Sequence, residues 1–386
     1  MASATGGFGY VFWFLVVLTV LVFVHELGHY LVARWNGVRV ETFSIGFGPE
    51  LFGWTDRADT RWKISAIPLG GYVKMFGDAD PSSMAPAPAQ VTLPAGGARE
   101  MTPDERAVAF HYKRLPQRAA IVAAGPIANF VFAIVALAGL FATVGQPFTL
   151  PQVGKVQDGS AAQAAGFQPG DTIVSIDGEA VERFEDVQRL VRLDPGAPLS
   201  VVIHRGDQDT TLSVTPKLSE ITDRFGNKHE YGLLGIEGQR VQYVRYNPAT
   251  AVMRATDETA DIVGGTLQAV WQMIIGARST DELGGPLRIA QMSGEVAQYG
   301  FSAILPFMAV LSINLGLINL FPIPVLDGGH LLFYAAEALR GRPLGQRAQE
   351  YGFRFGLALV LTLMVFATWN DLVHLRVVEF LKALVT

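Results

Sequence analysis

The first long apolar segment of the chain contains His25, Glu26 and His29 in the pattern H-E-x-x-H. Positions i and i+4 lie on one face of a helix, so both imidazoles can bind a single metal ion. Glu26 lies beside them, where its carboxylate could accept a proton from a metal-activated water. Ionisable groups within a membrane helix are energetically expensive, so a set without a metal would be strongly disfavoured. The pattern therefore predicts a catalytic metal site with two histidine ligands and Glu26 as the general base.

A catalytic zinc ion usually has three protein ligands and a fourth position for water, so a third ligand is expected elsewhere in the chain. The stretch NLFPIPVLDGGH, residues 319–330, places Asp327 directly after two prolines that interrupt an apolar helix. Irregular backbone at membrane depth is tolerated where it lines a cavity or packs inside protein. Asp327 is the predicted third ligand, and His330 is the alternative because an imidazole suits zinc equally well. Asp327 could instead serve only as the N-cap of the next helix.

The elements that must position these groups are membrane helices. A hydrophobic content of 50% with 17% charged residues predicts a membrane protein that also has a water-facing part. The net charge of −5 argues against nucleic acid as a partner, and the absence of cysteine excludes disulfides and thiolate metal sites. Crossing a bilayer takes about 20 mostly apolar residues. Four segments meet this requirement, at about residues 9–33, 119–144, 301–326 and 355–369.

Lysine and arginine residues near the ends of these segments predict the orientation of the chain, because cytoplasmic loops carry an excess of them. They are concentrated in the loops 34–118 and 336–354, which are therefore predicted to be cytoplasmic. The segment of about 145–300 has few basic residues near its ends and is expected on the opposite side. Four spans place both termini on that opposite side as well.

The region of about 150–216 has the pattern of a soluble domain, with short β-rich runs separated by turns. Within it, residues 159–178 (GSAAQAAGFQPGDTIVSIDG) resemble a PDZ domain of the kind attached to bacterial proteases. PDZ domains bind extended peptides at a sheet edge, so peptide binding or substrate gating is expected, and a passive spacer is the alternative. Residues 246–276 have helical spacing and predict an amphipathic helix, either at the membrane surface or packed on the PDZ domain.

Three motifs together resemble the site-2 protease family of intramembrane zinc metalloproteases: HELGH at 25–29, GPIANF at 125–130 and NLFPIPVLDGGH at 319–330. The resemblance covers essentially the whole chain. It implies a polytopic α-helical membrane protein with about four transmembrane helices, a membrane-associated β-hairpin loop and an inserted α/β PDZ domain. The corresponding regions are 1–145, 146–220 (PDZ), 221–299 (linker with the amphipathic helix) and 300–386. One PDZ domain is recognisable here, where the best-known members carry two.

The resemblance also implies a cofactor, a location and a class of substrate. One zinc ion per chain is expected, bound by His25, His29 and Asp327, with Glu26 as the catalytic base; this favours Asp327 over His330. The expected location is the bacterial inner membrane, with the PDZ domain and both termini in the periplasm. Expected substrates are single-span membrane proteins such as anti-sigma factors, or remnant signal peptides, cut in regulated intramembrane proteolysis. Membrane lipid and a peptide ligand of the PDZ domain are the other expected partners, and nucleic acid is not.

A substrate-binding strand is expected in the loop that follows the first span. A peptide bond inside a transmembrane helix is shielded, so a protease must unwind it, and an exposed strand edge can do so by strand addition. Residues 61–75 (RWKISAIPLGGYVKM) alternate in polarity and contain Gly70, Gly71 and Tyr72. They resemble the membrane-reentrant β-loop of the family, which has this role. An ordinary cytoplasmic hairpin is the alternative.

Three asparagines, Asn129, Asn314 and Asn319, lie in or beside the apolar spans. Buried amides commonly hydrogen-bond across helices, and this is the simplest account of them. The resemblance places Asn314 and Asn319 near the substrate cleft, so both are candidates for substrate binding.

Two other classes of function fit the sequence less well than proteolysis. A metal transporter would need polar ligands along several spans, and the second and fourth spans carry almost none. An inactive scaffold protein would usually have lost the glutamate, and Glu26 is present. The sequence therefore predicts a zinc endopeptidase that cuts transmembrane segments.

Overall fold

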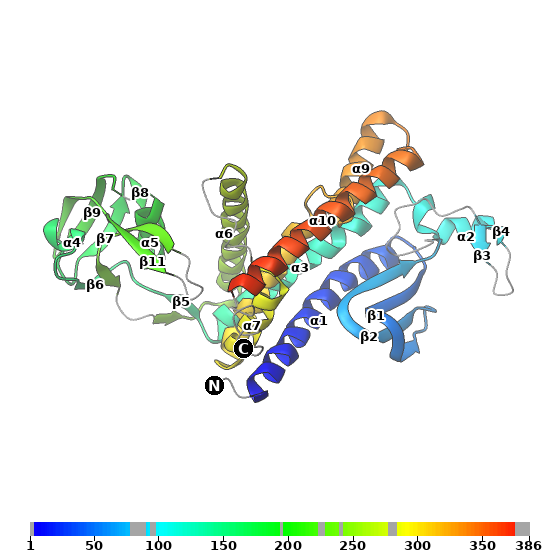
Figure 1. Cartoon of the computed structure of the whole chain (residues 1–386), viewed down its shortest axis with the longest axis horizontal. Coiled ribbons are helices and arrows are strands. Elements are labelled where there is room, and N and C mark those ends of the chain that lie inside the picture. The colour runs from blue at the N-terminus through cyan, green and yellow to red at the C-terminus, as the bar shows by residue number, and fades with distance from the viewer. Residues whose placement is uncertain are drawn as a thin grey trace, which may run out of the picture. The chain divides into compact units, whose positions relative to one another are not determined.

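The chain divides into two compact units (Figure 1). The first unit comprises the residues up to Leu140 and Pro248–Val373, and the second contains Phe141–Asn247. A computed structural model of the 386-residue chain describes residues 4–77, 90–92, 98–193, 196–222, 228–238, 242–276 and 284–374.

Four of the described helices are long and apolar enough to cross a membrane. They are α1 (Ala4–Trp35), α3 (Leu115–Thr143), α8 (Phe301–Asn319) and α10 (Gln346–His374). The helix α8 ends at Asn319, earlier than the predicted end near Leu326, because Pro322 and Pro324 cannot continue a helical hydrogen-bond ladder. The helix α10 begins earlier than the predicted start near Phe355, since residues 346–354 are mostly good helix formers. The chain is a membrane protein.

Small residues allow α1, α3 and α8 to approach one another closely. A Cβ atom at Gly28 of α1 would clash with the backbone of Ala124 in α3. On the other side of α3, a Cβ atom at Gly316 of α8 would lie 3.0 Å from the carbonyl oxygen of Pro126. Close approach of backbones through glycine and alanine is a common way to pack membrane helices. The approach brings the H-E-x-x-H turn of α1 directly against α3.

A β-sheet lies beside α1 (Figure 1) and is formed by β1 (Val40–Thr55) and β2 (Arg61–Met75). The rings of Phe43 and Trp62 stack with centroids 4.3 Å apart, and Tyr30 of α1 lies 5.0 Å from Trp62. Asp56, in the turn between the strands, accepts hydrogen bonds from the Tyr30 hydroxyl at 3.2 Å and from the Trp62 indole at 2.9 Å. These aromatic and polar contacts hold the sheet against the part of α1 that carries the two histidines.

Three more described helices of the first unit have ten or more residues: α6 (Pro248–Ile274), α7 (Pro286–Ala297) and α9 (Asp327–Arg340). The predicted amphipathic helix corresponds to α6, and its Thr266 hydroxyl donates a hydrogen bond to Asn314 of α8 at 3.2 Å. The buried carboxylate of Asp371 in α10 accepts hydrogen bonds from the backbone N–H groups of Gly285 at 2.8 Å and Leu287 at 3.0 Å, at the start of α7. Shorter elements of this unit are β3 (Gln90–Thr92), β4 (Ala98–Glu100), α2 (Pro103–Val108) and the 3-10 helix η1 (Phe110–Tyr112).

The second unit is a small α/β domain built around a four-stranded sheet of order β10-β9-β7-β8. Alternate residues of its central strands are fully buried, among them Ile173, Val201 and Ile203, as expected for a sheet with one face in a core. The helices α4 (Ala161–Ala164) and α5 (Phe184–Leu193) contribute to the same core. The strands of this unit are β5 (Gln146–Phe148), β6 (Val153–Val156), β7 (Thr172–Ile176), β8 (Glu179–Ala180), β9 (Leu199–Arg205), β10 (Gln208–Val214), β11 (Lys217–Thr222), β12 (Lys228–Leu233), β13 (Ile236–Gly238) and β14 (Gln242–Val244).

Candidate metal centre

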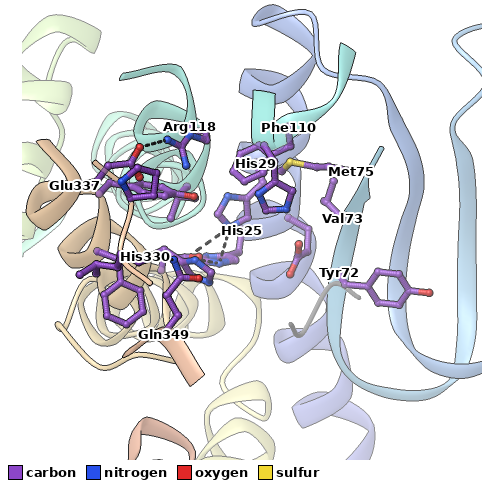
Figure 2. Close-up of a pocket in the computed structure, with 18 of the residues that line it drawn as sticks. His25, His29, Tyr72, Val73, Met75, Phe110, Arg118, His330, Glu337 and Gln349 are labelled. Atoms are coloured by element: carbon purple, nitrogen blue, oxygen red, sulfur yellow. Dashed lines mark hydrogen bonds and ion pairs between the residues drawn. The ribbon is translucent and has the colours of Figure 1, made fainter. Parts of the chain in front are cut away.

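His25, His29 and Asp327 converge in the first unit, although about 300 residues of sequence separate the aspartate from the histidines. The Oδ2 atom of Asp327 lies 3.2 Å from Nε2 of His25 and 3.5 Å from Nε2 of His29. The two Nε2 atoms are 3.2 Å apart. All three ligand atoms lie within 4.8 Å of one another, which is the spacing that one metal ion requires. Figure 2 shows His25 and His29 side by side in the pocket.

The helix α3 orients both imidazole rings. The Nδ1–H of His29 donates a hydrogen bond to the carbonyl oxygen of Ile121 at 2.9 Å, so Nε2 of that ring is left with its lone pair. Nδ1 of His25 lies 3.1 Å from the amide nitrogen of Asn129. Between these two positions, Gly125 makes room for the rings, because a Cβ atom there would clash with His29 and lie 2.9 Å from Cε1 of His25.

The segment between α8 and α9 carries Asp327 to the histidines. Short backbone hydrogen bonds fold it tightly: the N–H of Ile323 donates to Phe321 O, and the N–H of Val325 to Ile323 O, both at 2.7 Å. Gly356 of α10 provides a flat surface for this segment, since a Cβ atom there would lie 3.0 Å from the carbonyl of Pro324. The N-cap of α9 is Leu326, without a side-chain hydrogen bond, so the alternative account of Asp327 as an N-cap is wrong.

The three side chains suit a metal ion chemically as well as geometrically. The Oδ2 atom of Asp327 is buried and receives no hydrogen bond of normal geometry from the described residues. A buried carboxylate oxygen without a donor is costly, and a cation between it and two imidazole nitrogens removes that cost. Two imidazoles and one carboxylate, with room for a fourth ligand, form a typical donor set for catalytic zinc.

A cavity of about 410 Å³ opens over the three side chains, and Glu26 forms part of its wall. Glu26 follows His25 on α1 and lines the same cavity as the two imidazoles. The strand β2 passes close by: a Cβ atom at Gly71 would lie 3.2 Å from Cγ of Glu26 and 2.8 Å from Cγ1 of Val22. Only glycine allows the β2 backbone to approach the glutamate so closely.

The edge of β2 forms one wall of the cavity, through Gly71, Tyr72, Val73 and Met75. Gly71 pairs with Ile45 of β1, so this segment has a partner strand on one side. Gly70 does not line the cavity among the described residues; it has a φ of +95° and packs on the ring of Phe47. The structure therefore brings Gly71 and Tyr72, but not Gly70, to the candidate site.

The two predicted substrate-binding asparagines lie outside the residues that line the cavity in the described part of the chain. Asn314 accepts the hydrogen bond from Thr266, and the Asn319 amide donates to Leu315 O of its own helix at 3.0 Å. His330 lines the cavity, one turn after Asp327, but the three-residue metal group does not include it.

Sequence reasoning did not identify several residues of this site. Gly125 and Asn129 are four residues apart on α3, and the GPIANF motif was the signal that could have connected them with the histidines. Arg118 and Glu337 also line the cavity and form an ion pair at 2.6 Å, with the Arg118 guanidinium 4.9 Å from the centre of the Tyr334 ring. This pair links α3 to α9, the helix that begins at Asp327.

The chain is similar to known peptidases over nearly its whole length. The sequence profile of peptidase family M50 matches residues 13–363. A protein of Agrobacterium fabrum named as a zinc metalloprotease is 50% identical over 375 residues, covering 96% of this chain and 97% of the relative. Metalloprotease MmpA of Caulobacter vibrioides is 38% identical over 390 residues, covering 96% and 97%. Among solved structures, the PDZ domain of an SdrC-like protein from Listeria monocytogenes matches 22% of this chain and 84% of that chain, with 23% identity and a TM-score of 0.18.

Proposed function

Because this chain belongs to peptidase family M50 and is a zinc metalloprotease, we propose that it hydrolyses peptide bonds within the membrane-spanning segments of single-span membrane proteins. One observation carries this proposal: the donor atoms of His25, His29 and Asp327 converge between helices that are apolar enough to lie in a membrane. A metal site at such a place serves chemistry inside the bilayer, since ionisable groups there are otherwise costly.

In this proposal, one zinc ion would be held by His25, His29 and Asp327. As a Lewis acid, it would activate a water molecule and the scissile carbonyl. Glu26 acts as the general base, takes the proton from the attacking water and delivers it to the leaving amine. Its place on α1 beside the histidines and its exposure to the cavity support this role. The three proposed ligands and Glu26 all line the same cavity, where the substrate would bind.

The substrate is proposed to bind as an extended strand along β2. A transmembrane helix keeps its peptide bonds hydrogen-bonded within itself, and pairing with a strand edge compensates the loss of those bonds when the helix unwinds. The segment 71–75 lines the cavity and passes directly beside Glu26. Gly71 and Tyr72 are the proposed contact residues at this edge, and Asn314 and Asn319 are proposed to act further along the substrate.

The second unit is proposed to bind peptides in the manner of a PDZ domain. A groove of about 100 Å³ lies between α5 and the residues that precede β13. It is lined mainly by apolar side chains, including Val187, Val191, Leu234 and Ile236, which suits the apolar end of a trimmed substrate. We propose that this unit lies in the periplasm of a bacterium and that the loops 34–118 and 336–354 are cytoplasmic. Anti-sigma factors and remnant signal peptides are the proposed substrates.

The proposal is tested with the detergent-purified full chain and a model single-span substrate, comparing wild type with Glu26→Gln and measuring bound zinc in both. Loss of a general base should lower the cleavage rate by about 10²–10⁴-fold, while zinc stays bound because the three ligands are intact. Glu105→Gln is a matched control, since Glu105 is paired with Arg99 outside the cavity lining. Full cleavage by Glu26→Gln would refute the mechanism, and wild type without bound zinc would refute the metal site.

A further inference from the structure

We propose that Asn129 is a positioning residue that orients His25 for metal binding, by accepting a hydrogen bond from its Nδ1–H. This inference rests on the proposed zinc site and adds a residue to it. Nδ1 of His25 has the Asn129 amide as its neighbour at 3.1 Å, on the side of the ring away from Asp327.

The two histidines of the site are oriented by different kinds of group on the same helix. The partner of His29 is the carbonyl oxygen of Ile121, which can only accept a hydrogen bond. That ring is therefore held in the tautomer with a free lone pair on Nε2. The partner of His25 is a side-chain amide, which can either donate or accept. The state of His25 thus depends on a residue that mutation can change, while that of His29 depends on the backbone.

Metal binding by His25 requires a particular arrangement of this amide. The ring faces Asp327 and His29 with Nε2, so in the metal-bound state the hydrogen of the neutral ring is on Nδ1. An Nδ1–H needs an acceptor, and Asn129 supplies one when its Oδ1 points to the ring. In the structure the amide nitrogen is nearest to Nδ1, which suits the opposite tautomer, with a lone pair on Nδ1 and the hydrogen on Nε2. A half-turn of the amide about its last side-chain bond gives the metal-binding arrangement.

Two observations support this half-turn and the role of the residue. The Oδ1 atom of Asn129 is buried and has no hydrogen-bond partner among the described residues, so the turn replaces only the contact between the amide nitrogen and Nδ1, and it does so with a bond from Nδ1–H to Oδ1. The residue itself is fixed: it is 0% exposed, and the hydroxyl of Ser312 donates to its backbone oxygen at 2.9 Å. A Cβ atom at Gly316 would lie only 3.2 Å from Cβ of Asn129, so α8 packs directly behind it. Among the described residues, the partner of its side-chain amide nitrogen is a metal-site imidazole.

The test compares Asn129→Leu, which has a similar volume without polar atoms, with Asn129→Asp, which keeps an acceptor at the same position. Zinc affinity of the full chain in detergent is measured by competition with a chelator, and the absorption spectrum of the Co²⁺-substituted protein reports the geometry of the site. Loss of an outer-shell partner typically weakens metal binding by about 10–100-fold. We expect this loss for Asn129→Leu and an affinity within about threefold of wild type for Asn129→Asp. Asn36→Leu is the matched control, because it removes a half-buried amide that donates to Val32 O outside the cavity lining, and its zinc affinity should be unchanged.

Two results would overturn the role of Asn129. The first is zinc binding by Asn129→Leu within about threefold of wild type. The second is an equal loss in Asn129→Leu and Asn129→Asp, which would indicate that packing, not hydrogen bonding, matters at this position. If Asn129→Leu does not fold, Asn129→Ala decides by the same criterion, since it adds no bulk against Gly316. Only the ratio between variants tests this role; zinc binding by wild type tests the proposed function.

Discussion

Each unit of the molecule contains a buried aspartate oxygen, and the surroundings of the two differ. In the second unit, Asp171 is 1% exposed, and Arg205 donates to both of its carboxylate oxygens at 2.7 Å. The backbone N–H of Gln168 adds a further hydrogen bond at 2.8 Å. In the first unit, Oδ2 of Asp327 has no hydrogen-bond donor of normal geometry in the described residues, and two imidazole nitrogens lie 3.2 and 3.5 Å away.

The difference indicates that the Asp171 carboxylate stabilises the fold, whereas the Asp327 carboxylate is available to bind a metal ion. A buried charge with a bidentate arginine partner is satisfied within the protein and needs no further ligand. A buried oxygen without a donor lowers stability unless a ligand compensates it, so it is retained where that ligand serves a function. The comparison predicts that removing Asp327 affects metal binding and removing Asp171 affects folding.

The largest effect is expected for Asp327→Ala. The change removes a proposed ligand, so zinc affinity should fall by at least about 100-fold, more than for loss of an outer-shell partner. Cleavage of a single-span substrate should be lost with it. The measurement is zinc content after dialysis against a weak chelator, with Asp171→Ala as the control that retains zinc. Unchanged zinc in Asp327→Ala would instead favour His330, which lines the same cavity.

A smaller effect on the same site is expected for Gly125→Ala. The added methyl group would clash with the His29 ring and lie 2.9 Å from Cε1 of His25, so the rings must shift. Overpacking of this kind costs about 1–3 kcal/mol, or about 5–150-fold in zinc affinity if the metal site bears the strain. Gly139→Ala is a matched control on the same helix, because no atom lies within 4 Å of a Cβ at Gly139. Equal zinc affinities of the two variants would contradict this view of Gly125.

How much of this site the sequence could predict depends on whether its residues share one element. The spacing of His25 and His29 on one helix predicts a shared metal, and the predicted membership of the site-2 protease family is confirmed. The roles of Gly125 and Asn129 were not predicted, since they depend on which face of α3 packs against α1. Helix pairing of this kind is set by small residues at contact positions, and a single sequence does not show which helices those positions meet.

For the fold as well, features set by local sequence could be predicted, and contacts between distant residues could not. Apolar length predicts the four spans, and prolines explain why α8 ends before the Asp327 segment. By contrast, the pairing of Asp171 with Arg205 joins residues 34 positions apart on separate elements, and nothing in their local patterns connects them. The close packing of Gly356 against Pro324 could not be predicted either, because the helix α9 separates the two residues in the sequence.

A moderate effect confined to the second unit is expected for Asp171→Asn. The amide cannot replace both charge-assisted bonds to Arg205, so the free energy of unfolding of this unit should fall by about 2 kcal/mol. The value lies at the lower end of the range for buried pairs because the Arg205 side chain is 35% exposed. Hydrogen exchange of peptides from β7 and β9 measures the change, and zinc content should match that of wild type. Loss of zinc in this variant would contradict the separation of the two roles.

The smallest expected effect is the dependence of the stability of the second unit on pH, through the ionisation of Asp171. Burial alone would raise the pKa of Asp171, but the hydrogen bonds from Arg205 and Gln168 outweigh it and hold the pKa below the ordinary value of 3.8. The unfolded chain therefore binds a proton more readily than the folded one, so the contribution to stability is complete above the unfolded pKa and is lost as pH falls through the folded pKa. Exchange in β7 and β9 should accelerate, relative to the intrinsic rate, only below about pH 4. Asp171→Asn should lack this component, because its amide does not titrate. If both proteins lose protection in parallel as the pH falls, the stability of the second unit does not depend on the ionised carboxylate, and the contrast with Asp327 would then rest on hydrogen-bond geometry alone.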